Sequence, residues 1–579
     1  FDMQLQTDLD WARVRIPRRE IWTIDGTPLN QLLIVSAIKP REHVFLEARQ
    51  RKSRPDGPWF RAGMRPDEVR DIILDALRGG GWADVEPGEL RPARFGDTPG
   101  LRFDFSLANQ RGLAYRGLAA AAERNGKLTV LVWMAPTEHY HDRDVAAVSA
   151  MFDDPNLVSA AGLVPMLRLA RSAGLDELAQ SRLSVPTDKG ANAGGKVMAL
   201  VAGMLAGADS IDDMNLLRHG GMGRLFDRTY APSTLGSFLR EFRFGHVRQL
   251  DAVASRVNVS LAARAPLLQT RGGERVMVDL DDTIIEVHGY QKQGASFGYS
   301  GVRGLNALVA TASTTTSAPV ILAQRLRQGK TGSPKGAARI VADTLATLRR
   351  MDLGSSVRPL LRADSAFYGH ATIGTAIKAG ADVSVTVRMD PAVKTAIATI
   401  PEDGWETIEY PNAIRDEVTG RWISKAEVAE VPFVAFRSRK IAERVEGRLV
   451  VRRIPDLNPK QVEQPTLFDS YRHHAFFTTT DKQTMGTVAA DKTHRGHAII
   501  EQVHADLKAG PLAHLPSGVF TANSAWLVLA VIGFNLTRAA GLIADHAGRL
   551  ARATTATIRR TLISVPARLA RSARRITLH

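Results

Sequence analysis

Two apolar stretches of the chain carry aspartate where a buried strand is expected. The first is RVMVDLDDTIIEV, residues 275–287, with Asp281 near its centre, and the second is VRPLLRADSAF, residues 357–367, with Asp364 near its end. A carboxylate inside a buried strand costs free energy unless a cation or hydrogen bonds satisfy it. Two carboxylates held close together also repel each other unless a divalent metal ion lies between them. The two stretches therefore predict neighbouring strands that share a cation site.

The elements around these stretches predict the fold of this part of the chain. Further strands are expected at 304–313, 318–327 and 382–389, and helices at 333–351 and 370–380. Three consecutive strands followed by a helix, a strand, a helix and a strand is the element order of an RNase H-like fold. We therefore expect an α/β catalytic core with a mixed sheet and flanking helices. Its first part should cover residues 268–390.

A third constellation lies in the run HRGHAIIEQVHADLK. Steps of three and four residues place five polar side chains on one helical stripe: His494, His497, Glu501, His504 and Lys508. An apolar stripe would indicate packing against a partner element. A carboxylate among imidazoles and an ammonium group predicts a site for anions and metal instead.

The chemistry of the predicted metal site follows from the available ligands. The chain has no cysteine, so a metal ion must bind carboxylates or imidazoles, and hard oxygen ligands favour Mg²⁺ or Mn²⁺. Phosphodiester cleavage commonly uses two such ions about 3.5–4 Å apart. We predict Asp281, Asp364 and Glu501 as ligands. A structural role for Asp281, as a cap or in a salt bridge, is the alternative.

The charge of the chain predicts a polyanionic partner. The formal net charge is +16 and the pI is near 10.2. Residues 1–150 hold 22 Lys and Arg against 21 Asp and Glu, so the remainder holds 76 − 22 = 54 against 60 − 21 = 39. From Arg549 to His579 there are eight arginines and no acidic residue. One interpretation of this segment is a set of basic C-terminal helices over 546–579, in which Arg559 and Arg560 contact phosphate groups. The other is a basic face that only contacts solvent.

The composition changes near residue 155. Before it, alternating runs at 101–108, 112–123 and 127–136 predict strands, and 65–78 predicts a helix. This segment, residues 1–150, resembles the small α+β domains of PsbP-like bacterial lipoproteins. We expect it to be a separate domain that is foreign to the rest of the chain.

Residues 155–267 read as a helical region. Amphipathic segments are separated by Gly, Pro and Asp, and Ser233 or Thr234 after Pro232 would cap a short helix. A helix-turn-helix that binds DNA is one hypothesis for this region. A helical bundle without DNA contact is the alternative.

Residues 391–470 read as a β-rich, basic insertion into the core. Trp405 or Trp422 could stack on a flipped base there, although packing explains either tryptophan as well. The second part of the core, residues 471–545, should begin with the strand at 471–480 and lead into the Glu501 helix. An apolar run over 522–543 is interrupted by polar residues and predicts a buried core helix rather than a membrane span.

Together these motifs resemble the DDE-type bacterial insertion-sequence transposases, in particular the type called transposase DDE domain group 1. The resemblance covers about residues 155–579. It rests on VDLDDTIIEVHGYQKQGASFGYSGVRGLNALVAT, on LLRADSAFYG and on HRGHAIIEQVHADLK followed by an Asn-bearing apolar helix. It implies that Asp281, Asp364 and Glu501 are the catalytic triad. Asp279 and Asp282 are rival choices for the first position, and Asp282 should point to the opposite face of its strand from Asp281.

Related transposases carry Tyr-x(2)-Arg-x(3)-Glu-x(6)-Lys around the glutamate. This chain keeps Glu501 and Lys508 at that spacing but has His494 and His497 in place of Tyr and Arg, and Arg495 is displaced by two positions. The resemblance implies that Lys508 lies along the DNA backbone. It leaves phosphate contacts by His494, His497 and Arg495 as open candidates.

The resemblance implies a DNA transposase that binds the terminal inverted repeats of its element, cuts with Mg²⁺ or Mn²⁺ and joins the 3′-OH to target DNA. Double-stranded DNA and a second copy of the chain in a synaptic complex are the expected partners, with no membrane. The expected location is the bacterial cytoplasm, at the nucleoid. A metal nuclease without strand transfer and a catalytically inactive DNA-binding fusion are the alternatives.

Overall fold

The computed structural model consists of two compact units, residues 1–155 and 156–579. Their boundary coincides with the change of composition near residue 155. The structure describes the following ranges: 12–16, 18–23, 30–47, 57–95, 98–109, 112–137, 156–186, 188–226, 228–270, 274–298, 300–354, 357–408, 426–455, 471–545, 548–572 and 575–578.

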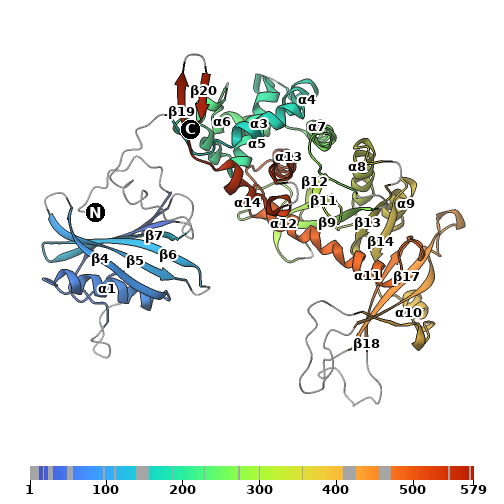
Figure 1. The fold of residues 1–579 in the computed structure, drawn as a ribbon, viewed down its shortest axis with the longest axis horizontal. Helices are drawn as coiled ribbons and strands as arrows, with labels where there is room; N and C mark the ends of the chain where they lie inside the picture. The colour runs from blue at the N-terminus through green and yellow to red at the C-terminus, as the bar shows by residue number, and fades with distance from the viewer. Residues whose placement is uncertain are drawn as a thin grey trace, which may run out of the picture. The chain divides into compact units, whose positions relative to one another are not determined.

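In the described part of the first unit, the helix α1 packs on an antiparallel sheet (Figure 1). Seven strands lie in the order β1-β2-β3-β7-β6-β5-β4. Their bounds are β1 Ala12–Ile16, β2 Arg19–Thr23, β3 Gln31–Ile38, β4 Ala83–Phe95, β5 Thr98–Ala108, β6 Ala114–Arg124 and β7 Lys127–Pro136. The helix α1, Pro66–Gly79, begins with proline at its first position and buries Val69, Ile73 and Leu77. The helix and the last three strands lie where the sequence pattern predicts them.

The second unit is built on a mixed sheet of ten strands. The order is β10-β11-β9-β13-β14-β18-β17-β16-β15, and β12 pairs with β11. The bounds are β9 Val276–Glu286, β10 Ser296–Phe297, β11 Arg303–Ser313, β12 Val320–Gln328, β13 Pro359–Ala363, β14 Asp382–Thr386, β15 Glu406–Ile408, β16 Ala426–Ala435, β17 Val445–Pro455 and β18 Tyr471–Thr478. Among the strands that the structure describes, only β9, β13 and β14 run parallel to one another. The helices α8, Ala337–Arg350, and α9, His370–Lys378, connect them, as the predicted element order requires.

The strands of the predicted insertion extend this same sheet. β18 pairs with β14 on one side and with β17 on the other, and β16 and β15 follow. In the described part of residues 391–470 the short helix α10, Pro391–Ala398, precedes the strands β15, β16 and β17. In the described part of this segment the strands do not form a sheet of their own.

The helices of residues 156–267 pack into the core of the α/β part. They are α3 Leu163–Ser172, α4 Leu175–Arg182, α5 Ala193–Ala206, α6 Pro232–Arg240 and α7 Phe244–Ala262. One continuous hydrophobic cluster contains residues of these helices, of the central strands and of α13, Phe520–Ala544. Among the described residues this helical region has no separate core. Its helix α6 starts at Pro232 with Ala231 as N-cap, so neither Ser233 nor Thr234 caps it.

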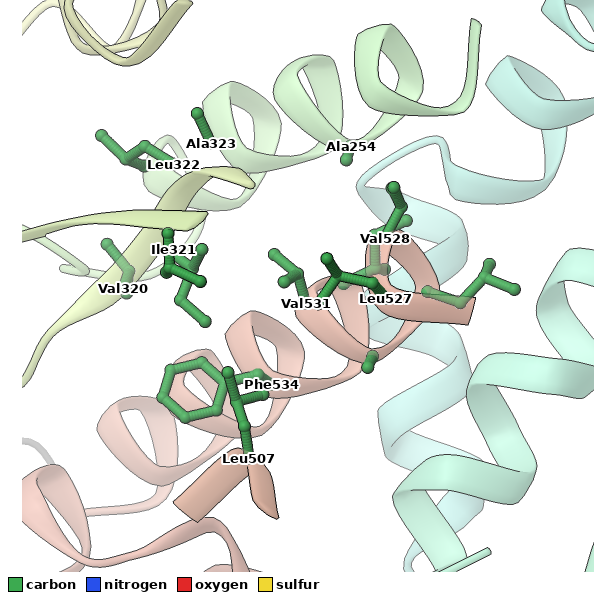
Figure 2. Packing of buried hydrophobic residues seen from close by; sticks show 14 of the residues in the cluster. Ala254, Val320, Ile321, Leu322, Ala323, Leu507, Leu527, Val528, Val531 and Phe534 are labelled. Carbon is green, nitrogen blue, oxygen red and sulfur yellow. The ribbon is translucent and has the colours of Figure 1, made fainter. Parts of the chain in front are cut away.

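The helix α13 is the centre of this shared core. It is long and apolar enough to cross a membrane by length and composition, yet 89% of its most apolar window is buried inside the protein. Figure 2 shows Val531 and Phe534 of α13 on the side of Ile321 of β12, and Val528 of the same helix on the side of Ala254 of α7. The apolar run thus forms a core helix here, as its interrupting polar residues suggest.

Asn535 on α13 pairs with the backbone of β12. Its side-chain oxygen accepts a hydrogen bond from Ile321 N at 2.9 Å, and its amide nitrogen donates to Ile321 O at 2.7 Å and to Asn258 of α7 at 2.9 Å. The ladder between β11 and β12 shifts register at this level, between Ala310 and Thr311. The buried side-chain amide of Asn535 thus provides hydrogen bonds to a backbone segment of β12 that β11 does not fully pair.

The C-terminal segment differs from its prediction. Only short helical turns occur at Arg549–Arg552, Thr555–Ile558 and Arg559–Ile563. The segment then forms two strands, β19 Ala567–Ser572 and β20 Arg575–Leu578, and β19 pairs with β8, Leu157–Val158. The prediction of helices at 567–578 is wrong because pairing with a strand distant in sequence overrides a weak local preference for helix.

Replacing Asn535 by Leu should destabilise the second unit by about 3 kcal/mol. The substitution keeps the volume but leaves Ile321 N–H and the Asn258 oxygen without their buried partner, and each loss costs about 1–3 kcal/mol. Urea unfolding measures the change. The control is Thr537→Val on the same buried helix, since Thr537 bonds only to Gly533 within α13. Equal destabilisation by the two variants would contradict the role given to Asn535.

Candidate active site

The strand register brings Asp281 and Asp364 side by side. β13 runs parallel to β9 and pairs Arg362 with Asp279 and Ala363 with Leu280. The next residue on each strand is therefore Asp364 and Asp281. Asp364 directly follows β13 and caps a short 3-10 turn, since its side chain accepts a hydrogen bond from Ala366 N at 3.0 Å. Two carboxylates that are 83 positions apart in sequence thus meet where β13 ends.

The surroundings of Asp281 and Asp364 disfavour the charged form of both carboxyl groups. The pKa of Asp281 is raised to about 6, mainly by burial; the negative charges of Asp364 and Asp282 act in the same direction, whereas a hydrogen bond from Asp282 N acts against it. Burial is also the main reason that the pKa of Asp364 lies above its ordinary value. A divalent cation would remove this penalty, so hard oxygen ligands in this setting fit Mg²⁺ or Mn²⁺.

The rival aspartates have protein partners. Asp282 lies on the other face of β9, where Arg327 Nη2 is 2.6 Å from Oδ2 and Asn306 donates a second hydrogen bond. This orientation follows from strand alternation, as predicted. Asp279 is fully buried and forms a two-pronged ion pair with Arg362, with both N–O distances 2.7 Å. Of the three aspartates on β9, Asp281 is thus the one that has no Arg or Lys partner in the described structure.

Arg362 links the two strands to the helical segment above them. Besides Asp279, its guanidinium donates to Thr493 O at 2.6 Å. His497 Nδ1 lies 2.9 Å from the same Asp279 carboxylate. A Cβ at Gly496 would stand 2.6 Å from Arg362 Nη1, so only glycine lets the helix approach this closely. Arg362 is not among the residues predicted from the sequence, although an arginine inside the apolar run VRPLLRA already indicates a buried carboxylate partner.

The polar stripe predicted from His494 to Lys508 lies on three consecutive helical elements. α11 covers Thr487–Arg495, a 3-10 turn covers Gly496–Ala498, and α12 covers Ile499–Lys508. His504 is buried with Nδ1 3.7 Å from Asp281 Oδ2, and burial lowers its pKa to about 4, so it is neutral. Glu501 lies one turn from both His497 and His504 and is exposed. It therefore shares the face that covers β9 and remains open to solvent.

The three predicted ligands are not assembled as a complete metal site. Within the ranges that the structure describes, no three His, Asp or Glu side chains stand together as ready ligands. Asp281 and Asp364 are adjacent, whereas in the described part of the chain no hydrogen bond or ion pair joins Glu501 to either. The prediction of Glu501 as third ligand remains a prediction.

The histidine His494 has a packing role in this structure. Its ring stacks on Phe476 at 4.1 Å, and its two nitrogens lie 2.9 and 3.0 Å from the hydroxyls of Ser384 and Thr386. Burial lowers its pKa to about 3. Both ring nitrogens are thus occupied, so a DNA contact by His494 would require these bonds to break.

The predicted basic contacts differ in exposure. Lys508 ends α12 and is exposed, although nearby protein lowers its pKa by desolvation. Arg495 forms an ion pair with Asp491 at 2.9 Å. Arg559 packs over Gly207, and burial lowers its pKa, whereas Arg560 is exposed.

The tryptophans proposed for base stacking are only partly described. Trp405 packs against Arg453, whose guanidinium carbon lies 4.3 Å from the ring centre and 4.5 Å from the ring of Tyr471. One face of Trp405 is therefore covered by a cation. Trp422 lies outside the described residues.

Comparison with known proteins gives one family match. A family model described as transposase DDE domain group 1 matches residues 141–579. No curated protein matches the chain.

Replacing Asp281 by Asn should stabilise the metal-free chain in a pH-dependent way. Because the pKa of Asp281 rises from 3.8 to about 6 on folding, the folded state favours the protonated acid. The penalty is absent below about pH 4, grows as the pH rises to about 6 and is complete above it. The full shift in pKa corresponds to a penalty of at most about 3 kcal/mol. Because the Asp281 side chain is 24% exposed, we expect a penalty of about 1–2 kcal/mol. Urea unfolding of both proteins at several pH values tests this; a difference that does not grow with pH contradicts it.

Replacing Arg362 by Met should cost about 3–5 kcal/mol, because Asp279 is then buried without its cation. The double variant Asp279→Asn with Arg362→Met should recover a large part of this loss. Urea unfolding of the single and double variants measures the recovery. If the double variant is no more stable than Arg362→Met, the buried ion pair is not what the helix and strands depend on.

Proposed function

The chain belongs to the DDE transposase family, and we propose that it binds the ends of a mobile DNA element, cuts them and joins the 3′-OH to target DNA. The single observation that carries this proposal is the adjacency of Asp281 and Asp364 at the end of β13. Both side chains are partly desolvated and lack a cationic partner in the described structure, whereas Asp279 and Asp282 have one. Such a pair suits divalent-metal phosphoryl transfer.

The fold that we propose for residues 268–390 and 471–545 is the RNase H-like core. The support is the element order β9, β11, β12, α8, β13, α9, β14, with β9, β13 and β14 parallel. In this proposal residues 391–470 are an insertion that widens the sheet. Residues 155–267 would contribute to DNA binding as part of the same core.

Two ions, Mg²⁺ or Mn²⁺, are the proposed cofactors. Asp281 and Asp364 would hold them, with Glu501 completing the ligand set from the helix that covers β9. When bound, the ions would supply Lewis acidity at the scissile phosphate. The chain's own residues then fix the geometry: the ion pair between Asp279 and Arg362 holds the two strands in register, and Arg362 also holds the helical segment through Thr493.

The proposed reaction needs no covalent link between protein and DNA. Water would attack first, and the freed 3′-OH would attack target DNA second. His504 is neutral and buried beside Asp281, so it can limit the orientations of that carboxylate without adding charge. Glu501 is exposed on the same helical face and can reach the solvent side where DNA must enter.

The proposed DNA contacts lie mainly outside the buried part of the stripe. Lys508 and Arg560 are exposed and suit phosphate contacts. Arg495 can reach phosphate only together with its partner Asp491. His494, His497 and Arg559 are engaged with protein groups and would contribute mainly by positioning.

The partners and location remain those that the family implies. We propose double-stranded DNA, both element ends and target, and a homodimer that brings two ends together. We place the protein at the bacterial nucleoid in the cytoplasm. The first unit, residues 1–155, has its own hydrophobic cluster, which suits a fused domain with a separate origin.

Replacing Glu501 by Gln should abolish metal-dependent cutting of DNA that carries an element end. Loss of a metal ligand removes several kcal/mol of transition-state stabilisation, or about 10³-fold in rate. Gel analysis of strand cleavage measures the effect, with Glu406→Gln, the same change at an exposed residue of β15, as control.

Full cutting by Glu501→Gln would overturn the proposed site. Pre-cleaved ends offered with target DNA then test the second step. Cutting without joining would identify a nuclease, and binding without cutting would identify an inactive DNA-binding fusion.

A further inference from the structure

The helices α7 and α8 meet beside the strand β12, and polar side chains line the groove between them. Most of these residues are three or four positions apart, so each set lies on one face of its helix. The groove encloses a cavity of about 220 Å³. Its polar side chains are Arg248, Asp251, Ser255 and Arg256 on α7 and Arg339, Asp343, Thr347 and Arg350 on α8.

At one end of this groove the arginines are paired with carboxylates. Arg248 lies 2.7 Å from Asp251 and 3.3 Å from Asp343. Arg325 of β12 lies 3.7 and 3.8 Å from the same two carboxylates, and Arg339 lies 3.1 Å from Asp343. Two carboxylates thus have three cationic partners. This end of the groove already holds more positive than negative charge.

At the other end the arginines bond to neutral groups. Arg350 donates from Nη2 to Ser255 Oγ at 2.6 Å and from Nε to Ala346 O at 3.1 Å. Arg256 donates from Nη1 to Ala252 O at 2.9 Å. Among the residues that the structure describes, neither arginine forms an ion pair. Their positive charge is therefore available to an anion from outside the protein.

A chain of hydroxyl groups fixes the orientation of the Arg350 guanidinium. Thr347 donates its proton to Asp343 O at 2.8 Å, so Ser255 is the donor in the bond of 2.6 Å between the two hydroxyls. The Ser255 oxygen then accepts from Arg350. In the described part of the chain, Nη1 of Arg350 donates to no protein group. A planar group that is held in place with donors to spare suits the oxygens of a phosphate.

A third arginine approaches this end of the groove from α4. Arg182 ends α4, which packs against α7. Two residues further on, Ser184 N donates to Gln249 of α7 at 3.0 Å. Burial and then the positive charges of Arg182 and Arg350 lower the pKa of Arg256. Like charges this close repel each other unless an anion lies among them, so the three arginines fit a polyanion.

The sheet relates this end of the groove to the candidate active site. Asp281 of β9 is opposite Val309 of β11, which is opposite Gln324 of β12. Two strand spacings place the backbone of Gln324 about 10 Å from that of Asp281. The side chain of Gln324 donates to Asp251 at 2.9 Å, one helical turn from Ser255. Nucleotides of one strand rise by about 3.4 Å each, so 10 Å corresponds to about three nucleotides.

We propose that Arg182, Arg256 and Arg350 bind the phosphate backbone of double-stranded DNA a few nucleotides away from the cut. The proposal rests on the transposase function given above and adds a second contact surface, built from α4, α7 and α8. Phosphate contacts carry no sequence information but fix the register and orientation of a duplex. This surface would therefore hold DNA of any sequence in position over the carboxylates.

The test measures the salt dependence of DNA binding by the full chain in EDTA. Fluorescence anisotropy follows a fluorescein-labelled blunt duplex of arbitrary sequence between about 50 and 200 mM salt. Each phosphate contact adds about 0.9 to the slope of log binding constant against log salt concentration. The double variant Arg256→Ala with Arg350→Ala should therefore give a slope that is shallower than that of the wild type by about 1.8.

Two further double variants are the controls. Arg264→Ala with Arg349→Ala removes two exposed arginines near the ends of the same two helices and should keep the wild-type slope. Arg256→Lys with Arg350→Lys keeps both charges and should also keep the slope, whereas a variant whose groove is misfolded would lose it.

The outcomes separate the two levels of the proposal. An unchanged slope in the alanine variant, or an equal loss in either control, overturns the phosphate site and leaves the transposase function standing. If the wild type fails to bind the duplex throughout the salt range, the transposase function fails with the site.

Discussion

The ion pair between Asp279 and Arg362 is the interaction on which the catalytic region of this protein depends. It joins directly opposed residues of β9 and β13 in a fully buried setting, and Arg362 extends it to Thr493 while His497 approaches from the same side. Taking these charges out of water is costly, so the pair is stable only while both strands and the helical segment keep their places. One buried arginine thereby fixes three chain segments that are far apart in sequence.

This constraint explains how the surrounding residues divide their roles. With Asp279 and Asp282 satisfied by Arg362 and Arg327, the charge left without a cation is that of Asp281, next to Asp364. The histidines of the helical stripe pack against the sheet, whereas Glu501 and Lys508 remain exposed at its outer side.

The sequence predicted the features that depend on local pattern. Alternation and apolar runs located the central strands and placed Asp282 opposite Asp281, and the family match agrees with the resemblance of the three motifs. Features set by distant contacts were missed. Nothing near Arg362 reveals that its partner is Asp279, and nothing near residues 567–578 reveals the pairing with β8. The 3-10 turn at Gly496–Ala498, which lets the helical segment approach Arg362, has no local signal beyond a single glycine.

If Asp281 and Asp364 together hold divalent metal, both side chains are needed for metal binding. Titration of the metal-free chain with Mn²⁺, followed by electron paramagnetic resonance, measures this directly in the absence of DNA. We expect Asp281→Asn and Asp364→Asn each to weaken Mn²⁺ binding at least about tenfold. Asp403→Asn, at an exposed aspartate of the turn Glu402–Gly404, should bind Mn²⁺ as the wild type does. Unchanged Mn²⁺ binding in both site variants would contradict it.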